Sequence, residues 1–197
     1  MFFIDFFFME KTVSMVIACP NCKGKAVMTE SIIEIPYFGK TLFSNLRCQE
    51  CSFNLNDISS DSEKPPTRFS VKISSEKDLT TKIVKSSSST VKIPELGVRI
   101  EPAPASEGYF TNIEGLLNKI LDSFSFTYFE EEEKDAKKLK EKLIKQIEQA
   151  KTAKFFFTVI VEDPFGNGAL ISDKAKKEKL NEKEVFELKK RMSFLGH

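Results

Sequence analysis

Hydrophobic and polar residues alternate along several short stretches of the middle of the chain, which is the pattern of half-buried β-strands. In the first of these stretches, Phe69, Val71 and Ile73 alternate with Ser70 and Lys72. The pattern predicts four strands before the chain changes character. They lie at residues 69–73, 83–84, 91–93 and 98–100, with a turn at residues 86–89.

Apolar residues then adopt the 3.6-residue period of amphipathic helices. The run Thr111-Asn112-Ile113-Glu114 has the spacing of a capping box, which predicts a helix that begins there and continues to Phe124. A second helix is predicted over residues 130–151, with acidic residues 130–133 at its start. Its apolar stripe consists of Ala136, Leu139, Leu143, Ile147 and Ala150.

Residues 155–162 form the most hydrophobic stretch of the second half and are apolar on both faces, so they predict a central strand. A turn at residues 163–168 follows. The C-terminal part is predicted to be helical, with Asn181 as the cap and Glu184 three residues later. Residues 174–191 carry eight basic and four acidic residues, which fits either a solvated helix end or a weak anionic contact.

The N-terminal segment and one polar segment farther along the chain determine the expected domain organisation. Residues 1–8 are apolar but too short for a membrane span, and no cleavage site follows them, so we expect a cytoplasmic protein. Residues 1–14 are either a product of start-site choice or a strand or tail packed on a neighbour. The polar segment 59–66 ends in two prolines and predicts a linker between domains at residues 16–58 and 67–197.

Composition narrows the possible functions. Lys and Arg number 30 against 29 Asp and Glu, a net charge of +1, so a globally basic nucleic-acid binder is not expected. The single histidine is His197, the last residue, which excludes the usual histidine-based catalytic centres. The sequence also lacks a phosphate-binding glycine-rich loop and a recognisable nucleophile with a paired base. We therefore expect a protein that is not an enzyme.

The four cysteines carry the clearest chemistry. Cys19-Pro20-Asn21-Cys22 and Cys48-Gln49-Glu50-Cys51 form two C-x2-C pairs separated by 25 residues. Two such turns supply four thiolates for tetrahedral zinc and leave no open position for a catalytic water. Redox or disulfide use is the alternative. We expect one zinc per chain, and we expect Cys48→Ser to unfold residues 16–58 while the following domain survives.

The segment between the cysteine pairs predicts a two-stranded ribbon. Its strands are expected at residues 27–35 and 42–46, with Gly24 providing a positive φ after the first pair. Residues 16–58 hold four basic and four acidic residues, so the ribbon lacks the positive charge that phosphate binding requires. Its aromatic residues could stack on bases, form a small core or bind a protein; they are Tyr37, Phe38, Phe43 and Phe53.

Several separated motifs resemble the ZPR-type zinc-finger family. The first is the double C-x2-C with Ile35-Pro36-Tyr37-Phe38 inside it, and the last is Asp163-Pro164-Phe165-Gly166-Asn167. Between them lie Asp78-Leu79, Val84-Lys85-Ser86, Ile93-Pro94-Glu95-Leu96 and residues 111–117. Together the motifs cover roughly residues 18–170, in the order and spacing of the family.

The resemblance implies a mainly β fold with α additions: a four-Cys zinc ribbon followed by a double-stranded β-helix-like domain with a helical hairpin. Eukaryotic members carry this unit twice and bind translation elongation factor 1-alpha in its GDP-bound form. A single unit is similar to a short archaeal form. Three positions depart from the family pattern, namely Ser52, Thr81 and Gly168, and Thr81 replaces an arginine that would carry charge.

Two interpretations of the matched polar residues stay open: they shape turns, or they meet a partner on a rigid scaffold. We expect both domains to grip the elongation factor. Tyr37 and Phe38 are the candidate apolar anchors, although Phe38 could instead be ribbon core. The candidate polar contacts are Lys85, Ser86, Asp163 and Asn167.

The leading hypothesis is a zinc-stabilised chaperone or adaptor for this GTPase. The alternatives are a zinc-ribbon nucleic-acid or ribosome-associated factor and, third, a small-molecule-binding β-barrel enzyme.

Overall fold

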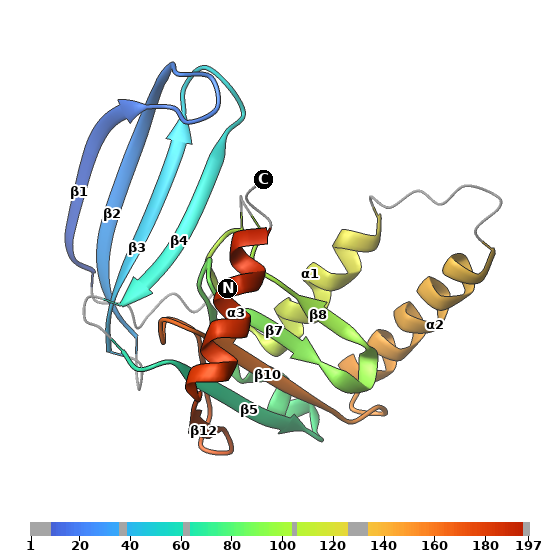
Figure 1. The fold of residues 1–197 in the computed structure, drawn as a ribbon. Coiled ribbons are helices and arrows are strands. Elements are labelled where there is room, and N and C mark those ends of the chain that lie inside the picture. Colours follow the sequence, from blue (N-terminus) through green and yellow to red (C-terminus); the bar gives the residue numbers. More distant parts are fainter. Residues whose placement is uncertain (1–8, 36–38, 61–63, 104–105, 126–133, 195–197) are drawn as a thin grey trace.

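The computed structural model describes residues 9–35, 39–60, 64–103, 106–125 and 134–194. These residues form twelve strands, three α-helices and two short 3-10 helices. The strands make three antiparallel sheets, with the orders β1-β2-β3-β4, β12-β5-β10-β7-β8 and β11-β6-β9. Figure 1 shows the first sheet standing apart from the other two, which share the rest of the chain with the helices.

The first sheet, here called the ribbon, is a meander of long strands. Its strands are β1 (Met9–Ala18), β2 (Lys25–Ile35), β3 (Gly39–Cys48) and β4 (Asn54–Ser60). The two predicted ribbon strands are confirmed as β2 and β3. The structure adds β1, in which residues 9–14 pair with β2, while residues 1–8 of the segment 1–14 lie outside the described residues. It also adds β4, which includes the first residues of the predicted linker.

The β-rich domain begins at β5 and uses two sheets. Its strands are β5 (Thr67–Ile73), β6 (Lys82–Lys85), β7 (Thr90–Ile93), β8 (Val98–Ile100), β9 (Tyr109–Asn112), β10 (Phe157–Asp163), β11 (Ala169–Ile171) and β12 (Lys176–Lys179). The 3-10 helices are η1 (Glu76–Thr80) and η2 (Pro94–Leu96). β10 pairs with β5 on one side and β7 on the other, which confirms the prediction of a central strand. The sequence analysis predicts no element at residues 176–179, and the structure adds β12 there as an edge strand on β5.

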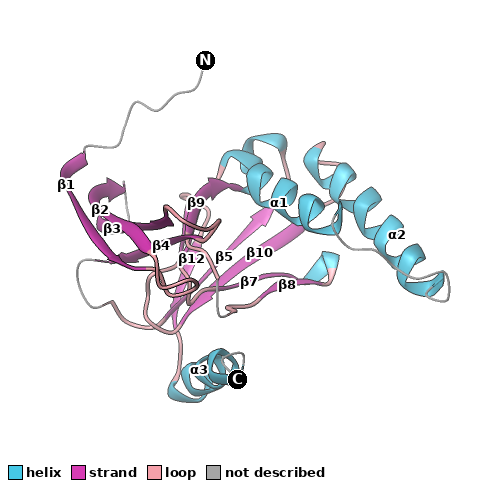
Figure 2. Cartoon of the chain, turned by 90° about the horizontal axis from the view of Figure 1, so that it is seen from above, coloured by secondary structure: helices cyan, strands magenta, loops and turns pink. Residues whose placement is uncertain are grey.

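Three α-helices complete this domain: α1 (Ile113–Ser125), α2 (Lys134–Lys151) and α3 (Glu182–Phe194). Figure 2 shows α1 and α2 side by side on one side of the five-stranded sheet and α3 on the other. The C-terminal half of the predicted α2 stripe is buried at Ile147 and Ala150, whereas Leu139 is exposed. The main core is formed by residues of the five-stranded sheet and of the helices α1 and α2, and it includes Val71, Val159 and Leu116.

The helix caps correct one prediction and confirm another. Asn112, not Thr111, caps α1, because the helix begins at Ile113 and Asn112 directly precedes it. The Asn112 Oδ1 accepts from the Gly115 N–H at 2.8 Å. At α3, Asn181 and Glu184 each accept a hydrogen bond from the other's backbone N–H at 2.9 Å. This reciprocal pair is the predicted capping box.

The ribbon and the β-rich domain share a second apolar cluster. It is built from the buried residues Ile35 and Ile58 of the ribbon and Val84 and Ala169 of the domain. Phe43 packs against it from the ribbon. The two parts of the chain are therefore joined by buried side chains as well as by the proline-containing segment.

Candidate metal centre and the polar junction below it

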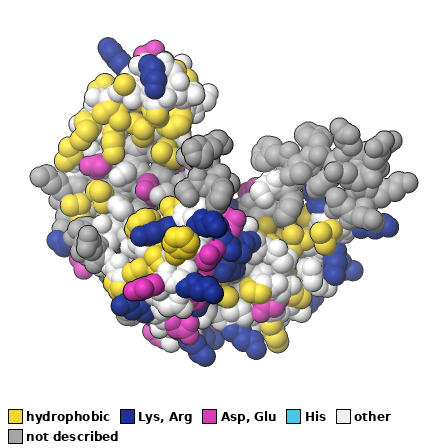
Figure 3. All heavy atoms as spheres, viewed as in Figure 1, with side chains coloured by type: hydrophobic (Ala, Val, Ile, Leu, Met, Phe, Trp, Pro, Cys, Tyr) yellow, Lys and Arg dark blue, Asp and Glu magenta, His cyan; other side chains and the backbone are white. Residues whose placement is uncertain are grey.

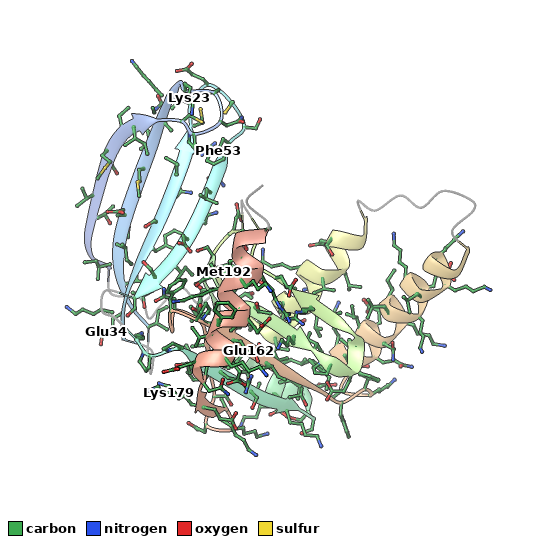
Figure 4. The ribbon with its side chains drawn as sticks, viewed as in Figure 1. Lys23, Glu34, Phe53, Glu162, Lys179 and Met192 are labelled. Atoms are coloured by element: carbon green, nitrogen blue, oxygen red, sulfur yellow. The ribbon has the colours of Figure 1, made fainter. Side chains whose placement is uncertain are left out.

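The four cysteines meet at the end of the ribbon farthest from the β-rich domain. Cys19 and Cys22 lie on the turn after β1, Cys48 is the last residue of β3, and Cys51 lies on the turn after it. Their four Sγ atoms lie within 4.8 Å of one another. In Figure 4 this end of the ribbon is marked by Lys23 and Phe53. The two cysteine pairs thus close on one position, as their spacing predicts.

The sulfur geometry fits a tetrahedral metal. The Sγ atoms of Cys19 and Cys51 are 3.8 Å apart, and those of Cys22 and Cys48 are 3.6 Å apart. A tetrahedron with Zn–S bonds of about 2.3 Å has edges of roughly 3.8 Å. These separations exceed a disulfide bond of about 2.05 Å, and all four cysteines are free. The donor set is the one that structural zinc takes, so zinc would be held by all four thiolates.

Backbone bonds shape the two cysteine turns. The Cys19 N–H donates to the Gly24 carbonyl at 2.8 Å, and Lys23 N–H donates to the Cys19 carbonyl at 2.9 Å. The positive φ of this turn is at Lys23, 63°, so the assignment of that conformation to Gly24 was wrong. An added Cβ at Gly24 would lie 2.4 Å from the Glu50 carboxyl carbon, so a larger residue here would displace the Glu50 side chain. That carboxylate accepts from the Lys25 N–H at 2.7 Å and links the turns.

The electrostatics of the four sulfurs favour a bound cation. The Gly24 backbone N–H lowers the pKa of Cys22, but hydrogen bonding to the neighbouring sulfurs outweighs it and raises this pKa to about 12. The Phe53 backbone N–H and the Asn21 amide lower the pKa of Cys51 to about 7. Four thiolates at this separation repel one another, and a divalent cation supplies the charge that lets all of them ionise.

A second polar cluster lies at the other end of the ribbon, where it meets the β-rich domain. Asp163, at the end of β10, is fully buried. It accepts hydrogen bonds from the hydroxyls of Ser86, Ser88 and Ser89, and from the Phe165 N–H at 2.8 Å. The turn at residues 86–89 and the turn at residues 163–168 are therefore one structural unit.

Lys85 is buried beside this cluster. Its Nζ donates to the Ser86 carbonyl at 3.1 Å, the Ser106 hydroxyl at 3.0 Å and the Glu107 carbonyl at 3.2 Å. Burial lowers the pKa of Lys85, while the negative charges of Asp57, Asp163 and Glu107 raise it. Burial is the larger effect, so the pKa of Lys85 lies below its usual value. All three N–H donors of the ammonium group have an acceptor within the fold.

Two side chains bridge the ribbon to these turns. The Asn167 amide oxygen accepts from the Ser60 N–H at 2.9 Å. On β4, Asp57 accepts from the Ser87 N–H and the Ser87 hydroxyl, both at 3.0 Å. Sequence reasoning counted Asp57 only as a charge of the ribbon, because its partner lies thirty residues away and no local pattern marks the pair.

The candidate partner-binding residues fall into three groups. Lys85, Ser86 and Asp163 are buried. Ser86 and Asp163 join their two turns, and Lys85 donates to Ser86, Ser106 and Glu107, so the structure favours the turn-shaping interpretation for them. Asn167 is half-buried and bridges to the ribbon. Tyr37 and Phe38 lie outside the described residues. A direct contact between any of these six residues and a partner remains a prediction.

Comparison with known proteins places both parts of the chain. Residues 12–66 match the family model described as the ZPR1 zinc-finger domain, and residues 77–196 match the ZPR1 jelly-roll domain. ZPR1-like proteins of two archaea are similar along most of their length. The one from Pyrococcus horikoshii is 39% identical over 87% of this chain and 79% of its own. The one from Methanocaldococcus jannaschii is 39% identical over 87% of both chains.

Eukaryotic relatives are longer. The zinc finger chaperone of Schizosaccharomyces pombe is 27% identical over 77% of this chain but only 34% of its own length. The matched jelly-roll domain is the double-stranded β-helix that the motifs imply, so the mainly β fold with a zinc ribbon in front is confirmed. None of the helices in the described ranges has the length and hydrophobicity of a membrane span.

Proposed function

This chain belongs to the ZPR1 zinc-finger family, and we propose that it serves as a cytoplasmic, non-enzymatic chaperone or adaptor for the GTPase translation elongation factor 1-alpha. The observation that carries the proposal is the match of both family domains, in order, on a chain whose four cysteines gather around one metal position. The naming of the fission-yeast relative as a zinc finger chaperone supports a protein client.

The chemistry of the described residues also supports binding rather than catalysis. Hydroxyls lie beside Lys85 and Asp163, but the lysine donates to three acceptors, and the buried Asp163 carboxylate is shared by three serine hydroxyls. Neither arrangement presents a free nucleophile to a substrate. Four cysteine ligands leave zinc no open position for water. The role of the metal is therefore structural, because it holds the two turns of the ribbon together.

The proposed anchors, Tyr37 and Phe38, follow β2 in the sequence. Their neighbour in sequence, Ile35, is buried in the cluster shared with the β-rich domain. A partner held there would contact both parts of the chain at once, and two linked contacts gain affinity through effective concentration.

The test is a titration of the protein with purified elongation factor loaded with GDP or with GTP. We expect binding, with a preference for the GDP form, and we expect Phe38→Ala to weaken it by roughly thirtyfold, the loss typical of an aromatic anchor. Phe156→Ala is the matched control, because Phe156 is an exposed phenylalanine before β10 and outside the proposed contact. Its affinity should equal that of the wild type.

Thermal stability is measured on the same samples. If Phe38→Ala lowers the melting temperature and leaves affinity unchanged, Phe38 is ribbon core and the placement of the contact is wrong. Absence of binding in both nucleotide states would contradict the proposed partner. RNA binding that falls steeply with salt would favour the nucleic-acid alternative instead.

A further inference from the structure

The outer strand of the ribbon has one unpaired side. In the described chain β1 pairs with β2 alone, in a continuous antiparallel register from Lys11 opposite Ile32 to Ala18 opposite Lys25. Figures 1 and 2 place β1 on the side of the ribbon away from the β-rich domain. Backbone donors and acceptors along this side are therefore directed away from the rest of the molecule.

This edge lacks the features that normally prevent strands from pairing with another chain. Residues 12–18 contain no charged residue and no proline. Val13, Met15 and Val16 are 43%, 44% and 66% exposed. The edge strand β12 of the other sheet, at residues 176–179, shows the opposite design, since its four residues are all charged and exposed.

Apolar side chains extend from β1 across one face of the ribbon. The register places Met15, Met28, Leu46 and Leu55 in one cross-strand row. Figure 3 shows hydrophobic side chains gathered on the ribbon. An added strand at β1 would continue this row, because residues opposite each other in an antiparallel pair share a face.

We propose that β1 pairs edge to edge, in antiparallel orientation, with β1 of a second copy of this chain. The sequence is self-complementary about Ser14. A two-fold axis at Ser14 sets Val13 of each copy opposite Met15 of the other, and Lys11 opposite Ile17. No like charges meet, and both copies contribute Val13 and Met15 to one apolar cluster.

The shape and charge of the molecule agree with this occupant. The β-rich domain lies beyond β4, at the far side of the ribbon, so the two domains of the dimer would lie at opposite ends of one eight-stranded sheet. A net charge of +1 gives little repulsion between copies. This inference does not depend on the identity of the client.

A charge swap tests the pairing and its register in the full chain. The mass in solution is measured by light scattering over a range of concentrations. The wild type should reach twice 22.4 kDa. Val13→Lys combined with Met15→Lys sets lysine opposite lysine and should weaken dimerisation by about tenfold or more. Val13→Lys combined with Met15→Glu sets lysine opposite glutamate and should restore the dimer.

Zinc content and circular dichroism show that each variant is folded. A wild type that stays at 22.4 kDa at all concentrations would overturn the proposal, even if an extended peptide binds at β1. Persistence of the dimer in the double-lysine variant would overturn it as well. Failure of the lysine–glutamate variant to dimerise would show that the proposed register is wrong.

Discussion

Asp163 illustrates, at the scale of one residue, what a motif can and cannot reveal. The run Asp163-Pro164-Phe165-Gly166-Asn167 predicts a turn, and Gly166 has the positive φ, 70°, that such a turn uses. The sequence could not show that the aspartate accepts from three serines more than seventy residues earlier. That arrangement depends on β10 lying beside β7, which is a property of the topology.

Replacement of Asp163 by asparagine should destabilise the protein. The amide keeps the size of the side chain but loses the charge that strengthens three buried hydroxyl bonds, so we expect the free energy of unfolding to fall by about 2 kcal/mol or more. Urea unfolding measures the change. Asp173→Asn is the control, because Asp173 is exposed, and its effect should stay within about 0.5 kcal/mol. Equal effects at both positions would refute the structural role.

At the scale of elements, α3 is attached largely through charged side chains. Glu162 on β10 pairs with Lys92 on β7 and with Arg68 on β5, whose guanidinium also reaches Glu184 on α3 at 2.9 Å. Arg191 of α3 pairs with Glu101 at 3.1 Å. Leu188 is the buried leucine of α3, whereas Phe186 is 65% exposed. In Figure 4, Glu162 lies behind α3.

This network predicts a dependence of stability on pH. Burial raises the pKa of Glu162, but the ion pairs with Lys92 and Arg68 outweigh burial and lower it below its usual value. A carboxylate with a lowered folded-state pKa stabilises the fold above the unfolded pKa of about 4.3, and that stabilisation is lost as the pH falls through the folded pKa. Glu162→Gln should therefore lower the free energy of unfolding by about 2 kcal/mol at pH 7. The difference in this free energy between the variant and the wild type should become smaller below about pH 4.

Urea unfolding midpoints at several pH values measure this difference in stability. Acid releases zinc from the wild type and from Glu162→Gln alike, so the comparison between them cancels that effect. Glu187→Gln is the control. Glu187 is exposed and lies on α3, the helix that Arg68 contacts through Glu184. A stability difference between Glu162→Gln and the wild type that stays constant from pH 7 to pH 3 would show that the ion pairs do not lower the pKa of Glu162.

Elements with a strong hydrophobic pattern were predictable, and elements defined by a neighbour were not. β10 follows from its continuous apolar run, and the helices α1 and α2 follow from their own periodicity. β12 reads Lys-Lys-Glu-Lys and has no apolar side, so only pairing with β5 makes it a strand. The metal site was predictable because cysteine chemistry and spacing are local, whereas the Asp57–Ser87 bridge joins distant residues and left no such signal.

At the scale of the whole molecule, the ribbon and the β-rich domain should not be independent. The sequence suggests two domains and a linker, and the boundaries at residues 16–58 and 67–197 remain a prediction. The structure adds a shared apolar cluster and the two bridges from Asp57 and Asn167. Loss of order in the ribbon would expose Val84 and Ala169 to water, which costs free energy in the other domain.

Cys48→Ser should therefore do more than release zinc. We expect the ribbon to lose protection from hydrogen exchange, and we expect β6 and β11 of the β-rich domain to exchange faster as well, because their buried side chains lose their cover. Mass spectrometry of exchanged peptides measures both effects. Ser52→Ala is the control, since Ser52 is exposed beside the cysteines and is not a ligand. Full protection of β6 and β11 in Cys48→Ser would show that the domains are uncoupled.

The position of β10 also sets an order of events during synthesis. The ribbon pairs only neighbours in sequence and is complete once Ser60 has left the ribosome. The five-stranded sheet has no centre until residues 157–163 emerge, because Val159 and Val161 fill the place between β5 and β7. Non-local pairing of this kind is slow. A nascent chain that pauses before Phe157 would thus present a finished ribbon and an exposed, half-built sheet, which is the stage at which this protein would itself need protection from aggregation.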